Sequence, residues 1–196
     1  MNSYQRQKLR KAVLSNIVIL IDSREQKNQH IIDFLNDNNI SHIQKKIDFG
    51  DYSFKVKKYT LESYFAIERK NSLDELIQNS VAIDDTTNNK INRIERELLR
   101  AQESGAYLEF MIENNSYDDI FENNYNSLMS INAVLGKINK YKFVYDCNIQ
   151  FVEKNIGEYI LNTCLGWAIN TLAYSEKIEF KNELLKELGV VKGVVK

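Results

Sequence analysis

This chain of 196 residues contains no proline, only seven glycines, two histidines and two cysteines. The scarcity of proline and glycine leaves few obvious hinges, and the length fits one globular domain. Cys147 and Cys164 cannot form a disulfide framework and lie among apolar residues, which indicates buried thiols in a reducing, cytoplasmic compartment. His30 and His42 show no metal-ligand spacing. These absences exclude a disulfide-stapled secreted domain and give no sign of a histidine-based metal site.

The sequence also lacks a signal peptide and a long hydrophobic run. Residues 1–11 are polar and basic, without the apolar core of a signal peptide. The longest apolar stretch, Ile156–Ala173, is interrupted by polar residues, so we expect a core helix rather than a membrane span. We therefore expect a chain that is neither secreted nor anchored in a membrane.

Neither sign of charge dominates, because 26 basic residues face 27 acidic ones and the formal net charge is −1. The whole molecule has no general attraction to nucleic acid, so binding to DNA must come from a local basic face. The candidates are Lys45, Lys46, Lys55, Lys57 and Lys58, and a second set at helical spacing, Arg93, Arg96 and Arg100. Phosphate contacts from such residues give salt-sensitive binding that tolerates many sequences. A solvated surface explains the lysines nearly as well.

The pattern of apolar residues predicts an α/β domain. Strand-like runs cover residues 17–21, 40–47, 51–56, 61–70, 106–113, 143–145 and 149–152. Helical patterns cover residues 29–38, a segment from Ser72, residues 88–104, 128–140 and 156–173, and a short segment after Phe180. This order predicts a central mixed sheet flanked by helices, with the strands between residues 40 and 70 forming a meander or hairpins.

Several helix boundaries are also marked. Ser72 and Glu75 have the spacing of a capping box. Gly105 predicts the end of the 88–104 helix, and Asn155 with Glu158 predicts the start of the 156–173 helix.

The candidate catalytic residues lie in two short segments. Asp51 follows Gly50 in a turn, and Glu68, Arg69 and Lys70 end a strand. Successive side chains on a strand point to opposite faces, so we expect Glu68 and Lys70 on one face and Arg69 on the other.

Two carboxylates and an amine in this arrangement are typical of metal-dependent phosphodiester cleavage. Mg²⁺ takes oxygen ligands and accepts one or two carboxylates completed by waters and a substrate phosphate. A buried lysine shifts its pKa readily, so Lys70 is a candidate to position or deprotonate a water. A solvated charged turn is the ordinary explanation of such a run. Here the run directly follows Tyr64-Phe65-Ala66-Ile67, whose composition indicates a buried strand.

Three segments of the sequence resemble the nuclease domain of the XPF family of structure-specific endonucleases. They are Ile19–Glu25, Phe49–Tyr52 and Glu68–Asp74. The last two carry the family signature of Gly-Asp, a variable gap, Glu-Arg-Lys, three residues and Asp. The resemblance is strong over residues 17–74, fair to residue 113 and weak beyond. It implies a restriction-endonuclease-like core of the PD-(D/E)xK type.

The resemblance implies a metal site for Mg²⁺ or Mn²⁺. By position in the motif, Asp51 and Glu68 would be metal ligands, joined by the main-chain carbonyl of Arg69. Asp22 would add a further carboxylate, and Lys70 would orient the attacking water.

Other matched positions are expected to support this site. Arg69 and Asp74 match positions that the family needs for activity and are expected to form a supporting pair. Arg24 and Glu25 match the family as well, without a defined role.

The family implies an endonuclease that cuts double-stranded DNA near junctions, flaps or forks, in repair or recombination. Two alternatives stay open. One is a non-catalytic DNA-binding or scaffolding partner, although no motif residue is missing. The other is a PD-(D/E)xK nuclease of another class, such as a restriction or recombination enzyme.

The expected organisation is an N-terminal extension over residues 1–15, a nuclease domain over 16–178 and a short tail over 179–196. The tail is too short for the tandem helix-hairpin-helix domain of the family, so junction selectivity does not follow from the resemblance. Family nuclease domains dimerise through their last helices, so residues 156–173 form either core or a homodimer contact. A stand-alone nuclease rich in Asn, Lys and Ile is typical of a bacterial or phage protein from an AT-rich genome.

Overall fold

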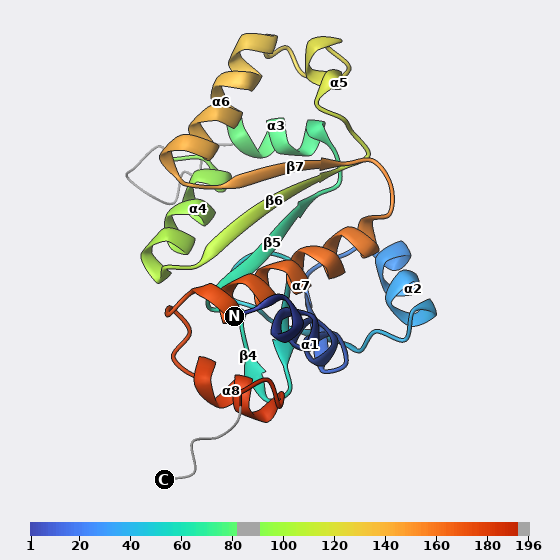
Figure 1. Cartoon of the computed structure of the whole chain (residues 1–196). Helices are drawn as coiled ribbons and strands as arrows, with labels where there is room; N and C mark the ends of the chain where they lie inside the picture. The colour runs from blue at the N-terminus through green and yellow to red at the C-terminus, as the bar shows by residue number, and fades with distance from the viewer. Residues whose placement is uncertain (82–90, 192–196) are drawn as a thin grey trace.

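A mixed sheet with helices packed around it forms the centre of the molecule (Figure 1). Its strand order is β2-β1-β3-β5-β6-β7, and the short β4 pairs with β3. The structure is a computed structural model that describes residues 1–81 and 91–191. The strands are β1 Ile17–Asp22, β2 His42–Lys45, β3 Tyr52–Val56, β4 Tyr59–Thr60, β5 Phe65–Lys70, β6 Tyr107–Glu113 and β7 Asn148–Val152. The helices are α1 Ser3–Leu14, α2 Gln29–Asp37, α3 Leu73–Val81, α4 Arg93–Ser104, α5 Asp118–Phe121, α6 Ile131–Val144, α7 Ile156–Tyr174 and α8 Lys181–Glu187.

The sheet confirms the predicted α/β class. The predicted meander or hairpins between residues 40 and 70 are confirmed in part, because β3 pairs antiparallel with β4 and with β5. β2 pairs in parallel with β1 rather than with β3, because α2 carries the chain back to the start of the sheet before β2 begins. β1 therefore lies between β2 and β3. β3 runs antiparallel to both β1 and β5, whereas β5, β6 and β7 run parallel to one another.

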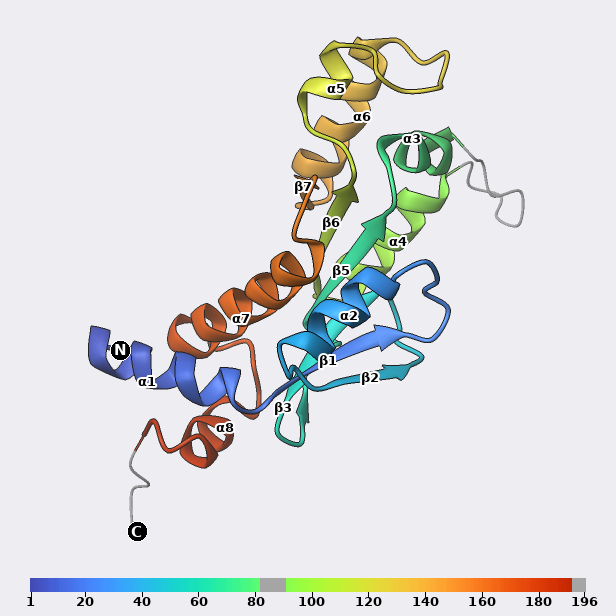
Figure 2. The ribbon, with the colours of Figure 1, turned by 90° about the vertical axis from the view of Figure 1, so that its right-hand side faces the viewer.

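Helices cover both faces of the sheet, because successive side chains of β5 are buried on opposite faces. Phe65 and Ile67 belong to the core shared with α1, α2, α7 and α8. Ala66, one position out of phase, belongs to the core shared with α3, α4 and α6. Figure 2 shows β5 and β6 between α7 on one side and α4 on the other. Side chains at the end of β5 are therefore directed alternately towards α2 and towards α4.

The last long helix, α7, is largely core. Nine of its residues are buried within this chain, and α1 lies against it with Leu9 and Val13 fully buried. Ile156–Ala173 is thus accounted for within the monomer, and the homodimer stays a prediction. Among the described helices, none combines the length and the apolar character needed to cross a membrane.

Several predicted boundaries were wrong, among them the start of the 61–70 strand, which begins at Phe65. Residues 143–145 are not a strand, because the buried series Val134, Ile138 and Tyr141 continues α6 to Val144. Helical periodicity there overrides the aromatic and β-branched composition that resembled a strand. The 128–140 helix accordingly begins at Ile131, after the cap Ser130. The helices α1 and α5 and the short strand β4 were not predicted.

The predicted caps had mixed outcomes. Gly105 ends α4 with φ of +72°, as predicted. The capping box at Ser72 is incomplete, because the Glu75 carboxylate accepts the amide of Asn71 instead of that of Ser72. Asn155 precedes α7 but adopts a left-handed conformation without a side-chain cap. α4 begins at Arg93, and residues 88–90 of its predicted range lie outside the described residues.

Candidate active site

Gly50 and Asp51 connect the end of β1 with the middle of β5. The amide of Asp51 donates to the Ile67 carbonyl at 2.8 Å, and the Asp51 carbonyl accepts the amide of Asp22 at 2.8 Å. Gly50 has φ of +73°, and a Cβ atom there would lie 2.8 Å from the Cβ atom of Ala66. Only glycine combines this conformation with such close approach to a neighbouring strand. Gly50 therefore allows Asp51 to reach the strand that carries the Glu-Arg-Lys triplet.

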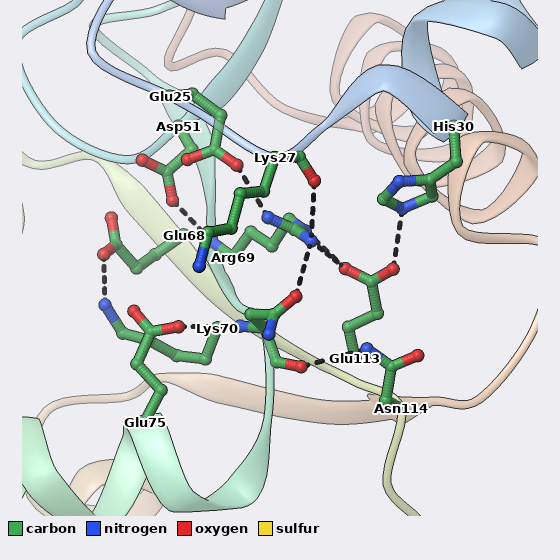
Figure 3. Close-up of polar contacts among 11 residues, drawn as sticks. Glu25, Lys27, His30, Asp51, Glu68, Arg69, Lys70, Glu75, Glu113 and Asn114 are labelled. Atoms are coloured by element: carbon green, nitrogen blue, oxygen red, sulfur yellow. Dashed lines mark hydrogen bonds and ion pairs between the residues drawn. The ribbon is translucent and has the colours of Figure 1, made fainter.

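The three residues that end β5 divide between the two faces of the sheet, as predicted (Figure 3). Lys70 Nζ donates to Glu68 Oε1 at 2.5 Å, and both side chains are buried. The guanidinium group of Arg69 lies on the opposite face. Glu68 and Lys70 are thus together, and Arg69 is separate from them.

Asp51, Glu68 and Lys70 line a polar hollow beside α4. Its other acidic lining residues are Asp22, Glu25, Asp48, Glu75 and Glu97. Its other basic lining residues are Arg24, Arg69, Arg93 and Arg100. The structure thus gathers most of the predicted catalytic residues in one place, together with acids that the sequence reasoning did not single out.

The two central carboxylates resist ionisation. Burial, followed by the negative charge of Glu25, raises the pKa of Asp51 to about 7. Burial and the neighbouring Asp51 raise the pKa of Glu68 well above its ordinary value. For Lys70, burial acts to lower the pKa, but the charges of Glu68 and Glu97 outweigh it and raise the pKa. Lys70 is therefore a charged ammonium group beside two carboxylates that need a cation.

Asp22 is buried and has all its acceptor positions occupied. Its Oδ1 accepts the amide and Nε of Arg24, at 2.8 and 2.7 Å. Its Oδ2 accepts Arg24 Nη2 and the amide of Ile47, both at 2.9 Å. Burial opposes ionisation of Asp22, but these hydrogen bonds lower its pKa. In this arrangement Asp22 holds the segment after β1 in place, and its role as a further metal ligand stays a prediction.

Arg69 forms a buried ion-pair network on the α2 face of the sheet. Its guanidinium group binds Glu113 at the end of β6 and contacts Glu25 Oε1 at 2.7 Å. Glu113 also contacts His30 Nε2 of α2 at 2.6 Å. Arg69 therefore joins β5, β6 and the segment after β1 beneath the hollow.

Asp74 does not form the predicted pair with Arg69. Its carboxylate accepts the amide of Asn126 at 2.6 Å and Asn126 Nδ2 at 2.9 Å. It lies in the first turn of α3, which begins three residues after Lys70. Within the described residues, Asp74 fastens the loop before α6, and Glu25 and Glu113 take its expected place beside Arg69.

The basic candidates for DNA contact separate into two groups. Arg93 and Arg100 project from α4 into the lining of the hollow, and Arg96 lies on the same helix. None of the five predicted lysines is among the described residues that line it. Lys57 and Lys58 bind Glu187 of α8, past the far end of β3 from Asp51. Lys45 is paired with Glu62 at 2.8 Å. Lys46 directly follows the edge strand β2, and Lys55 lies on β3.

Two important residues were missed. Glu113 is the acid partner of Arg69, and Glu97 faces the hollow from α4. Glu97 could have been found from its spacing, because positions 93, 97 and 100 share one face of a helix. Glu113 carries no such signal, since its proximity to Arg69 depends on the pairing of β5 with β6.

The oxygen donors fit a hard divalent cation. Across residues 1–81 and 91–191, no three acidic, histidine or cysteine side chains already converge to enclose an ion. Asp51 and Glu68 nevertheless provide the one or two carboxylates with which Mg²⁺ is commonly held, the remaining ligands being waters and phosphate. Their raised pKa values show that burial makes two neighbouring negative charges unfavourable here, and a bound cation would favour the ionised form of both carboxylates.

A mixed sheet flanked by helices, with two carboxylates and a lysine beside β5, defines the restriction-endonuclease-like class. Within this class, the chain belongs to the ERCC4-domain family of XPF nucleases, because the ERCC4 domain model matches residues 21–160. The resemblance seen in the sequence is thereby confirmed.

Solved structures agree on the fold. XPF from Aeropyrum pernix is 13% identical with a TM-score of 0.53, over 90% of this chain and 75% of that chain. XPF from Aeropyrum pernix in complex with DNA is 12% identical with a TM-score of 0.53, over 88% of this chain and 82% of that chain. No curated protein sequence matches the chain.

Proposed function

We propose that this protein is a divalent-metal-dependent DNA endonuclease that hydrolyses phosphodiester bonds in flap, fork or other branched DNA, in repair or recombination. The observation that carries this proposal is the approach of Asp51 and Glu68 to Lys70 in one polar hollow. Membership of the ERCC4 family supports a nuclease acting on DNA. The DNA-bound XPF of similar fold supports DNA as the ligand.

Asp51 and Glu68 would hold Mg²⁺ or Mn²⁺, with the carbonyl of Arg69 as a further oxygen. When bound, the cation would lower the pKa of a coordinated water and neutralise charge on the phosphate. Asp22 would position the adjoining segment through Arg24 and Ile47.

Lys70 would position the attacking water or a phosphate oxygen by donating hydrogen bonds. Its raised pKa keeps it an ammonium group, so it is not the base in this proposal. Arg93 and Arg100, on the α4 side of the hollow, would hold the DNA backbone near the carboxylates.

The test is cleavage of a panel of flap, fork, duplex and single-stranded DNA with Mg²⁺ or Mn²⁺. We expect Asp51→Asn and Glu68→Gln each to lose more than about 100-fold in cleavage rate while still binding DNA. Glu103→Gln is the matched control, since Glu103 is an exposed acid on α4 outside the hollow. A wild-type chain that leaves every substrate intact would refute the proposal. Equal cleavage of plain duplex and branched DNA would refute the proposed preference for branched DNA.

A further inference from the structure

Lys70 has a buried ammonium group with unused donors. Its side chain is 2% exposed, and among the described residues the hydrogen bond to Glu68 is the one that Nζ makes. The ring of Phe110 lies 5.7 Å from Nζ. An ammonium group has three N–H donors, and leaving buried donors unbonded is costly.

Glu97, in contrast, has a buried oxygen without a hydrogen-bond donor among the described residues. Its Oε2 atom is buried and has no hydrogen-bond partner within the described part of the chain. Its Oε1 meets Arg93 Nε at 3.7 Å, beyond hydrogen-bonding distance. Glu97 lines the same hollow as Lys70, and its charge contributes to the raised pKa of Lys70. One buried group lacks acceptors, and a nearby one lacks a donor.

A cation bound to Glu68 would compete with Lys70 for the same carboxylate. In the proposed function, Glu68 offers its oxygens to the metal ion, but Lys70 already contacts Glu68 Oε1 at 2.5 Å. A divalent cation and an ammonium group sharing one carboxylate would repel each other strongly in a buried site. Lys70 therefore needs another acceptor when the site is loaded.

We propose that Glu97 is a positioning residue that takes over the ammonium group of Lys70 when Glu68 turns to the cation. This inference rests on the proposed function of the site. The transfer satisfies Glu97 Oε2, keeps Lys70 charged, and holds it between α4 and the carboxylates. Metal binding thereby orders the lysine that positions the water.

The direct test is a crystal structure of the wild-type protein with Ca²⁺ in place of Mg²⁺. We expect Lys70 Nζ within about 3.2 Å of a Glu97 oxygen. A calcium-bound structure in which Lys70 stays on Glu68 alone would overturn the inference. This measurement requires no variant to fold.

The second test is a double-mutant cycle on Mn²⁺ affinity, measured from the electron paramagnetic resonance signal of free Mn²⁺. Glu97→Gln should weaken Mn²⁺ binding about tenfold in the wild-type background. In the Lys70→Met background, the same change should weaken it less than about twofold, because no lysine remains to be transferred. Equal weakening in both backgrounds would overturn the inference, since Glu97 would then act on the cation directly.

Two controls separate this inference from the proposed function. Glu103→Gln removes an exposed charge from the same helix and should leave Mn²⁺ affinity unchanged. Asp51→Asn should abolish Mn²⁺ binding. If it does and the cycle shows no coupling, the positioning role fails while the metal site stands. If wild type binds no Mn²⁺, both fail.

Discussion

The main-chain amide of Arg69 donates a 2.8 Å hydrogen bond to Asp51 Oδ2. This bond, from a main-chain amide to a side-chain carboxylate, joins the Gly-Asp turn to the Glu-Arg-Lys strand. The side chain of the same residue points to the other face, where it binds Glu113 and Glu25. Arg69 thus supports the hollow from both faces of the sheet.

Gly50→Ala should lower the free energy of unfolding by about 2–4 kcal/mol, combining left-handed strain with crowding against β5. Gly105→Ala is the matched control: Gly105 has φ of +72° but nothing within 4 Å of an added Cβ atom. Gly105→Ala should lower the free energy of unfolding by about 1 kcal/mol. Urea denaturation measures both, and equal losses would show that the approach of Gly50 to Ala66 does not matter.

Arg69→Met should lower the free energy of unfolding by about 3–5 kcal/mol at pH 7, because it leaves Glu25 and Glu113 without their buried partner. The control is Lys45→Met, which breaks the more exposed pair with Glu62 and should cost less than about 1 kcal/mol. Chemical denaturation distinguishes them. A similar small loss for both variants would contradict the supporting role of Arg69.

Without metal, the protein should lose stability as pH rises through the range where Asp51 ionises. Its folded pKa is raised to about 7 by burial and by Glu25. The favourable contribution of the protonated form is full below the unfolded pKa and disappears as pH passes the folded one. In EDTA, Asp51→Asn should therefore match wild type near pH 4 and exceed it by more than about 1 kcal/mol at pH 8. A constant difference across this range would refute the shifted pKa.

Arg93→Ala and Arg100→Ala should each weaken DNA binding without changing sequence preference. If each arginine contacts one phosphate, the slope of log affinity against log salt should fall by about 0.9 per substitution. Fluorescence anisotropy in Ca²⁺ measures this without cleavage. Lys58→Ala is the comparison, since Lys58 binds Glu187 by α8 and should leave the slope unchanged. A larger change of the slope in Lys58→Ala than in the two arginine variants would show that the DNA binds near α8 rather than at the hollow.

Local patterns were sufficient to predict much of the site. Alternation along β5 placed Glu68 and Lys70 on one face and Arg69 on the other, and the paired contacts confirm it. Gly50 was marked by the motif, and its positive φ provides the physical reason. Such features depend on residues close in sequence, where strand geometry leaves few choices.

Patterns failed where partners are distant in sequence. The pairing of Arg69 with Glu113 spans 44 residues, and it exists because β5 and β6 are neighbours. Asp74 has the motif spacing, but the turn into α3 takes it to Asn126.

The sequence by itself determined the fold class and the Asp51, Glu68 and Lys70 set, because strand alternation and a specific motif act over short stretches of chain. Tertiary structure alone decided that β1 lies between β2 and β3. It also decided that α4 brings Glu97 and its arginines to the hollow. These arrangements depend on which surfaces are buried together, and no local pattern specifies that.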